Sequence, residues 1–243
     1  MIISHKYKYL FVELPRTGST AISNELIKNY DGEEILEKHS SYNDFLKIAN
    51  CEEKKYFVFS CIRNPLDKVV SRYHKLKSNQ QNPHNNIERL QEQNRKIPLG
   101  IFYLKKQYDF IHKYNANFSQ YFLKFYKYPY SDWSILNHKS FDYIIYFEKI
   151  NEDFEKVLKV LKIEIKRELP IINKTRGKDN NYLTYFNNQK LIKRAIYVFG
   201  LYMEMWNYSF PDDWGNIKIP VFSKIQLFIF NIFRKFYWKY LKS

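Results

Sequence analysis

Apolar runs, each followed by a polar turn and a stretch with helical spacing, recur three times along the chain. The first run covers 10–14 (LFVEL), the second 56–62 (YFVFSCI) and the third 141–147 (FDYIIYF). Short apolar runs bounded by charge are typical of strands that are buried on both faces of a parallel sheet. The alternation of such strands with helices predicts an α/β protein with a central parallel sheet flanked by helices.

Capping residues predict the start of the helix that follows the second apolar run. Asn64 is a natural N-cap, and Pro65 suits the first position of a helix. Apolar residues at helical spacing predict further helices over 150–161 and 187–206. By contrast, residues 78–95 are rich in Asn and Gln and poor in apolar residues, so we interpret them as a long excursion from the core.

The last part of the chain has a pattern of its own. Residues 224–243 carry five basic side chains and no acidic one, and their apolar residues recur at helical spacing. This pattern suits a helix on an anionic membrane surface, with docking on the protein body or contact with a second subunit as alternatives. We therefore expect a main domain over 1–215 and a basic amphipathic tail over 216–243. The apolar side of the tail helix comprises Ile225, Ile229, Ile232, Phe233, Phe236 and Tyr240.

The composition of the chain gives it a strong positive net charge. The 243 residues include 40 Lys and Arg against 25 Asp and Glu, which gives a formal net charge of +15. Such a charge attracts polyanions without saying which, and a general role in solubility is the alternative. The two cysteines, Cys51 and Cys61, exclude a disulfide scaffold and a cysteine metal cluster. Since neither a signal-peptide pattern nor a membrane-spanning stretch is visible, we expect a cytoplasmic protein, at most peripheral to the inner face of the membrane.

The first candidate site is the turn between the first apolar run and its helix, Pro-Arg-Thr-Gly-Ser-Thr at 15–20. A strand that turns tightly into a helix leaves backbone N–H groups and the positive end of the helix dipole facing an anion. Arg16 adds a charge and the hydroxyls add donors. The turn lacks the G-x-x-x-x-G-K-[ST] pattern of nucleotide hydrolases, because Ser19 stands where the lysine would be. An ordinary strand–turn–helix corner is the alternative.

The second candidate site follows the second apolar run. Arg63 ends that run, where ligands of open α/β sheets usually bind, and Ser71 lies about two turns into the next helix. The guanidinium offers a bidentate fork to a phosphate, and the hydroxyl offers a further donor. A helix start with an exposed Arg and Ser is the alternative.

The order of these two motifs resembles a known family. Pro-Arg-Thr-Gly-Ser-Thr after one strand, and Arg-Asn-Pro with Ser-Arg-Tyr (71–73) after a later one, are similar to the motifs of PAPS-dependent sulfotransferases. PAPS is 3′-phosphoadenosine 5′-phosphosulfate. The resemblance is to the carbohydrate O-sulfotransferase branch, including heparan sulfate 2-O-sulfotransferase-like proteins and their bacterial relatives. It implies a P-loop-like three-layer fold, PAPS as donor, and a hydroxyl of a carbohydrate or glycolipid as acceptor.

The resemblance also implies roles for particular residues. In that family the first loop binds the 5′-phosphosulfate of PAPS, the second motif binds its 3′-phosphate, and a later loop closes over the nucleotide. Carried over residue by residue, these roles fall on Arg16, Thr17, Gly18, Ser19 and Thr20, then on Arg63 and Ser71, and then on Asn173, Lys174 and Thr175.

The resemblance implies catalytic roles for His39 and Arg16. His39 leads a segment in the place where the family carries its catalytic base, and imidazole is well suited to accept a hydroxyl proton near neutral pH. Arg16 stands where the family commonly has a lysine near the leaving phosphate, and Tyr146 stands where an arginine is often found. His74 and Glu13 are the alternatives for the base. No metal is expected in this chemistry.

Two functions of other classes compete with sulfuryl transfer. A P-loop small-molecule kinase needs Mg²⁺ ligands and a loop lysine, and the sequence shows neither in the expected places. A non-enzymatic binder of nucleic acid or anionic membrane explains the charge of +15 and the basic tail. Such a binder has no need of both phosphate motifs in this order, so we expect no nucleic-acid partner.

Overall fold

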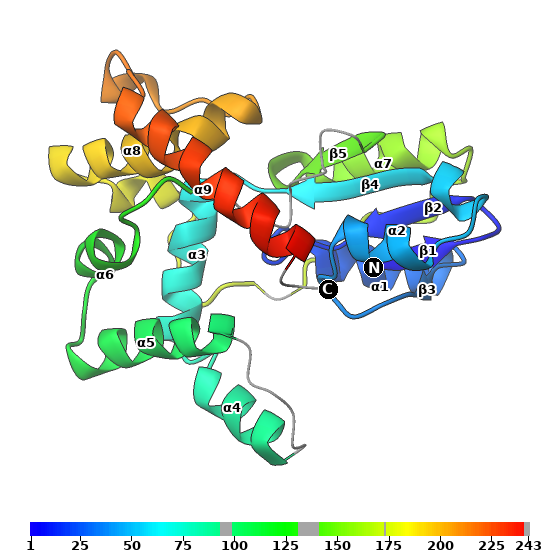
Figure 1. Ribbon diagram of the computed structural model, residues 1–243, viewed down its shortest axis with the longest axis horizontal. Coiled ribbons are helices and arrows are strands. Elements are labelled where there is room, and N and C mark those ends of the chain that lie inside the picture. The colour runs from blue at the N-terminus through cyan, green and yellow to red at the C-terminus, as the bar shows by residue number, and fades with distance from the viewer. Residues whose placement is uncertain (93–98, 131–140, 173, 241–243) are drawn as a thin grey trace. The chain divides into compact units, whose positions relative to one another are not determined.

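The computed structural model describes residues 1–92, 99–130, 141–172 and 174–240, without the side chains of residues 235 and 237–240. The chain divides into two compact units. Met1–Asn64 and Asp132–Lys174 form the first, which we name the sheet unit, and Pro65–Ser131 and Thr175–Ser243 form the second, the helical unit. Figure 1 labels the elements of both.

The sheet unit is built on five strands in the order β3-β1-β2-β4-β5. β2, β4 and β5 run parallel to one another, while β1 pairs antiparallel with β2 and β3. The predicted parallel sheet is thus confirmed for β2, β4 and β5, and the sheet as a whole is mixed. The strands are β1 Ile2–Ser4, β2 Tyr9–Val12, β3 Glu33–Glu34, β4 Phe57–Ile62 and β5 Tyr143–Tyr146.

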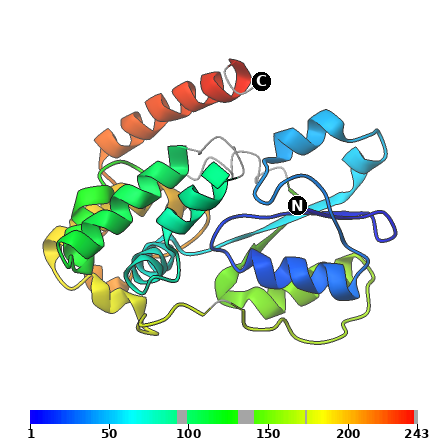
Figure 2. The same cartoon turned by 90° about the horizontal axis from the view of Figure 1, so that it is seen from below.

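Helices cover both faces of this sheet. α1 (Ser19–Asn29) and α7 (Ile150–Val160) share one apolar cluster with Tyr9 and Phe11 of β2, whereas α2 (Tyr42–Ile48) shares another with Leu10 and Val12. Alternate residues of β2 therefore point to opposite faces, and all four are buried, as a strand between two helical layers requires. Figure 2 shows α2 on one side of the sheet and α1 and α7 on the other.

The helical unit is held together by a core rich in aromatic rings. Phe122 lies at its centre and contacts the rings of Phe118, Phe186 and Phe199. The helices are α3 Pro65–Lys77, α4 Pro83–Glu92, α5 Leu99–Lys113, α6 Phe118–Phe125, α8 Gln189–Met205 and α9 Val221–Tyr240, with short 3₁₀ turns at Tyr182–Tyr185 and Asp212–Trp214.

The predicted helices are found close to their expected positions. α3 begins at Pro65, α7 covers most of the predicted 150–161, and α8 lies within the predicted 187–206. Residues 93–95 of the predicted excursion 78–95 lie outside the described residues, and the rest of it contains a helix, α4, which the lack of apolar residues had concealed. Cys61 is fully buried in β4.

Candidate active site

Both sequence motifs of the sheet unit come to the same edge of the sheet. β2 and β4 are parallel neighbours, with Val12 opposite Ser60. The loop 13–18 continues from β2 to α1, and Arg63 follows directly on β4. Because the carboxyl ends of parallel strands meet at one edge, the two motifs lie where open α/β sheets bind their ligands.

The loop after β2 folds back on itself through its hydroxyl groups. Thr17 Oγ1 and Ser19 Oγ both donate to the carbonyl oxygen of Leu14, at 3.0 and 2.9 Å. α1 starts at Ser19, and the first N–H groups of a helix have no acceptor inside it. Among the described backbone hydrogen bonds, none starts from the N–H of Gly18, Ser19 or Thr20. These N–H groups are the donors that the loop offers, and the hydroxyl protons of Thr17 and Ser19 hold its shape.

Two residues of the loop have left-handed backbone conformations. Arg16 has a φ of 64° and Gly18 has a φ of 81°. A Cβ at position 18 would also lie 2.7 Å from Ile150 Cδ1 and 3.0 Å from Phe147 Cδ2, so the Ile150 side chain would have to shift to make room for it. The strain at Arg16, a residue with a full side chain, costs about 1–2 kcal/mol. Strain of this kind is concentrated at functional sites.

Arg63 joins the second motif to the first. Its Nη1 donates to the carbonyl oxygen of Arg16 at 3.4 Å, and its guanidinium lies 4.0 Å from the centre of the Phe147 ring. Beside it, Cys61 Sγ donates to the carbonyl oxygen of Thr17 at 2.8 Å. The loop is therefore anchored to the end of β4 by two side chains.

His39 contacts the start of the same loop. Its Nδ1 lies 3.2 Å from the backbone carbonyl oxygen of Glu13. A carbonyl oxygen only accepts, so Nδ1 carries the proton, and Nε2 of the neutral ring keeps its lone pair. Burial lowers the pKa of His39 below its ordinary value, against the opposing influence of Glu13. The ring is thus neutral at pH 7, with a basic nitrogen turned away from its backbone partner.

Glu13 and Lys38 form an ion pair under the loop. The Glu13 carboxylate is buried, accepts from Ser23 Oγ at 2.7 Å and lies 3.7 Å from Lys38 Nζ. Burial raises the pKa of Glu13, but the Ser23 hydroxyl, the Met1 ammonium group at 3.1 Å and Lys38 outweigh it, so the pKa falls below its ordinary value. Lys38 also donates to Thr20 Oγ1 at 3.2 Å. The sequence interpretation missed Lys38, whose only local signal is its place next to His39.

Most of the remaining predicted residues belong to the helical unit, whereas Lys174 is the last residue of the sheet unit. Ser71 is buried on α3, within the helical unit. His74, the alternative base, is also on α3; burial lowers its pKa, and its Nε2 is buried without a hydrogen-bond partner among the described residues. Lys174 is exposed and Thr175 is half-buried, while Asn173 lies outside the described residues.

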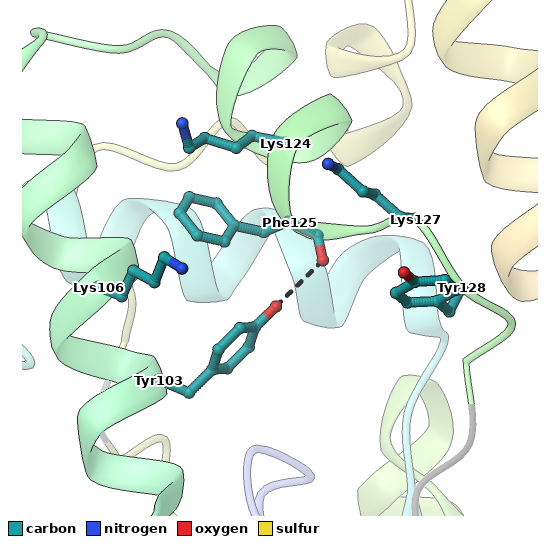
Figure 3. Close-up of a pocket in the computed structure, with 6 residues that line it drawn as sticks. All are labelled: Tyr103, Lys106, Lys124, Phe125, Lys127 and Tyr128. Carbon is teal, nitrogen blue, oxygen red and sulfur yellow. Dashed lines mark hydrogen bonds between the residues drawn. The ribbon is translucent and has the colours of Figure 1, made fainter. Parts of the chain in front are cut away.

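The helical unit has a hollow of its own, of about 450 Å³. Tyr103 OH donates to the carbonyl oxygen of Phe125 at 3.1 Å across it, and Lys124 Nζ lies 4.3 Å from the centre of the Phe110 ring. The buried Nε of Arg72 has no hydrogen-bond partner in the described part of the chain, and Tyr103 is among the tyrosines that interact electrostatically with this guanidinium. Figure 3 shows the lining residues Tyr103, Lys106, Lys124, Phe125, Lys127 and Tyr128.

Comparison with known proteins shows the family to which the chain belongs. A family model described as the sulfotransferase family matches residues 1–209. The chain belongs to the sulfotransferase family. Separate comparisons with curated proteins and with solved structures found no match. The family match spans the whole sheet unit and most of the helical unit, and it ends before α9.

Membership identifies the protein as a sulfotransferase and sulfuryl transfer as its general chemistry. Family membership favours sulfuryl transfer over the two alternatives, which are a P-loop small-molecule kinase and a purely non-enzymatic binder of nucleic acid or anionic membrane. Among the described residues of this sulfotransferase, no cluster of three or more His, Cys, Asp and Glu side chains is placed to hold a metal ion.

Proposed function

We propose that this sulfotransferase moves the sulfuryl group of PAPS to a hydroxyl of a carbohydrate or glycolipid acceptor, with His39 as general base. The observation that carries the proposal is the hydrogen bond from Arg63 to the Arg16 carbonyl. It brings a second guanidinium to a loop whose helix-start N–H groups make no described hydrogen bond. PAPS carries phosphate groups at its 5′ and 3′ ends, and the two motifs offer cations for both.

The chemistry of these residues fits the donor. A helix N-terminus favours an anion through its N–H groups and its dipole, so the 5′-phosphosulfate is assigned to the start of α1. Arg16 and Lys38 supply positive charge to that end. Arg63, with Ser71 as the family resemblance implies, is assigned to the 3′-phosphate. An arginine fork suits a phosphate because two parallel N–H···O bonds fix its orientation.

The proposed step is an in-line displacement at sulfur. Nε2 of His39 accepts the proton of the acceptor hydroxyl, and the oxygen forms a new bond to sulfur. The bond between sulfur and the 5′-phosphate oxygen breaks, and its electron pair leaves with 3′,5′-ADP. Arg16, Lys38 and the N–H groups of the loop stabilise the charge that develops on the leaving phosphate.

The hollow of the helical unit supports an acidic sugar as acceptor. Tyr103 and Tyr128 offer aromatic faces for a sugar ring, and Lys106, Lys124 and Lys127 offer positive charge to a carboxylate or sulfate. The buried Arg72 Nε adds to this charge, because a guanidinium without a full set of acceptors favours an anion nearby. We therefore assign the acceptor's acidic group to this hollow.

The proposed base is tested by His39→Asn in a transfer assay with PAPS and a panel of neutral and acidic oligosaccharides, read by mass spectrometry. Asparagine tolerates the left-handed backbone that His39 adopts at φ 68°. We expect a loss of about 10²–10⁴ in rate with binding of 3′,5′-ADP retained. The matched control is His5→Asn, on an exposed histidine of the same unit, and it should keep full activity. Transfer that survives in His39→Asn contradicts the assignment.

The acceptor site is tested by the pair of substitutions Lys106→Ala and Lys127→Ala. Removing two charges should raise KM for acidic oligosaccharides about tenfold or more and leave KM for neutral ones unchanged. Lys54→Ala together with Lys55→Ala removes the same charge from an exposed turn of the sheet unit and serves as control. Equal effects on acidic and neutral acceptors contradict the proposal.

A further inference from the structure

α9 exposes apolar side chains where an ordinary surface helix exposes polar ones. Val221, the first residue of α9, is 70% exposed, and seven further large apolar residues follow at intervals of one or three positions. This spacing places them on one face of the helix. The other members of this face are Phe222, Ile225, Phe228, Ile229, Ile232, Phe233 and Phe236, each at least 44% exposed. We refer to the eight residues as the apolar face of α9.

The opposite side of α9 is held to the helical unit by polar contacts. Ser223 is fully buried, and its Oγ donates to the carbonyl oxygen of Tyr197 at 2.8 Å. The hydroxyl of Tyr197 in turn donates to Gln226 Oε1 at 2.7 Å. Leu227 is nearly buried on the same side. Helix α9, red in Figure 1, thus docks on α8 through the side that carries Ser223, Gln226 and Leu227, and leaves its apolar face to solvent.

This arrangement is the reverse of what folding in water favours. Apolar surface is stabilised by leaving water, at about 25 cal/mol per Å², and soluble monomers rarely expose large contiguous apolar patches. Eight large side chains in one line mark a surface that meets another apolar phase. The polar contacts of Ser223 and Gln226 fix the helix in the orientation that presents this surface.

The charge of residues 221–243 indicates which apolar phase the apolar face of α9 meets. Residues 221–243 include Lys224, Arg234, Lys235, Lys239 and Lys242 and no acidic residue. A second copy of the helix would bring like charges together, whereas anionic lipid headgroups complement them. Aromatic residues are frequent here, and their rings favour the boundary between headgroups and acyl chains. Among the described residues, no helix is long and apolar enough to pass through a bilayer.

We propose that α9 lies flat in the surface of an anionic membrane, with its apolar face among the lipid acyl chains and its lysines and arginine at the headgroups. An α-helix of 20 residues is about 30 Å long, so the whole face engages one leaflet along its length. The enzyme is thereby held at a surface, and acceptors that are lipid-linked share that surface. The proposal rests on α9 alone and stands whatever the acceptor is.

The test is co-sedimentation of the full chain with vesicles of phosphatidylcholine, with and without phosphatidylglycerol. We expect binding to the anionic vesicles, weakening as salt is added. The double variant Phe228→Ser, Phe233→Ser keeps every charge and should bind about tenfold or more weakly, because two buried rings are lost. Its thermal unfolding should match the wild type, since both rings are exposed in the protein without lipid.

The matched control removes two exposed rings elsewhere in the helical unit. Phe102→Ser with Tyr114→Ser should leave vesicle binding unchanged, because both residues lie outside α9. A wild-type chain that ignores anionic vesicles, or binds neutral ones equally well, overturns the proposal. A dimer in sedimentation velocity that Phe228→Ser, Phe233→Ser dissolves, without vesicle binding by the wild type, assigns the face to a second copy and also overturns it.

Discussion

The loop of the sheet unit and the hollow of the helical unit hold their cations in different ways. In the sheet unit, the cations at the loop are hydrogen-bonded to it: Arg63 to the Arg16 carbonyl and Lys38 to the Thr20 hydroxyl. At the hollow of the helical unit, Lys124 Nζ lies over the Phe110 ring, 4.3 Å from its centre. Hydrogen bonds fix both the position and the direction of the cations at the loop, whereas the contact with a ring fixes neither closely for Lys124.

This difference matches what each unit is proposed to bind. A donor whose reacting atom must be aligned needs fixed partners, because a small displacement lowers the rate strongly. An acceptor sugar or a membrane surface is met by aromatic faces and mobile ammonium groups, which adapt to more than one shape. The predictions below test this contrast between a rigid sheet edge and an adaptable helical surface.

The largest effect is expected from Gly18→Ala. The new Cβ would lie 2.7 Å from Ile150 Cδ1 in a left-handed backbone, so the combined strain should reduce the free energy of unfolding by about 2–4 kcal/mol. Gly100→Ala in α5 is the matched control, because nothing lies within 4 Å of its Cβ position and alanine favours helices. Urea denaturation measures both. Equal losses in the two variants would show that the loop is not rigid.

Arg63→Ala should weaken binding of 3′,5′-ADP by about tenfold to a hundredfold. The estimate is the net contribution of hydrogen bonds to a charged group, about 1.5–3 kcal/mol. Lys77→Ala is the control, since this lysine lies over the Tyr73 ring in the helical unit and belongs to neither proposed site. Isothermal titration calorimetry gives both affinities. An unchanged affinity in Arg63→Ala removes Arg63 from the nucleotide site.

A smaller effect is expected from Arg167→Ala, which breaks an ion pair on the same unit. Arg167 Nη2 lies 2.7 Å from Glu25 Oε2, and its hydrogen bonds lower the pKa of the buried Glu25. Because the folded-state pKa is lowered, the stabilisation is present above the ordinary value of 4.5 and is lost as the pH falls through the folded value. We expect Tm to fall by roughly 2–5 °C at pH 7 and by less at pH 3.5.

The control for that pair is Lys55→Ala, which breaks a pair with Glu52 in which both side chains are at least 70% exposed. Such pairs contribute little, so Tm should change by less than about 2 °C. A loss for Arg167→Ala that does not depend on pH would contradict the role of Glu25.

The smallest effect concerns the titration of His39, followed by NMR of its ring nitrogens and assigned with His39→Asn. Burial lowers the pKa of His39, so it should titrate below 6.5 and carry its proton on Nδ1 when neutral. The base form then persists on the acidic side of pH 6.5, and the rate of transfer should persist there with it. A proton on Nε2 of the neutral ring contradicts the proposed role.

Local signals account for the parts of this fold that the sequence predicted. β4 is a continuous apolar run, α3 begins at the Asn64–Pro65 signal, and the turn at 15–20 breaks at Pro15 and Gly18. Each of these depends on residues that are neighbours in the chain. The placing of Arg63 beside the first loop was implied by parallel pairing, because two successive parallel strands end at one edge.

Other features depend on contacts that no local pattern records. β1 and β3 have three and two residues, too few for a periodic signal, and they form only by pairing with each other and with β2. The inward turn of the Thr17 and Ser19 hydroxyls follows from the position of the Leu14 carbonyl. Lys38 reaches Thr20 across 18 residues of chain, so its place at the loop was visible only in the fold.

The central claim is that the loop at 15–20 and Arg63 together bind a nucleotide with a phosphate at each end. Calorimetric titration of the wild-type chain with 3′,5′-ADP and with 5′-ADP tests it directly, because the two ligands differ in where the second phosphate is attached. We predict that 3′,5′-ADP binds at least about tenfold more tightly, the difference that one well-placed charged contact supplies. Equal affinity, or a preference for 5′-ADP, would contradict the account.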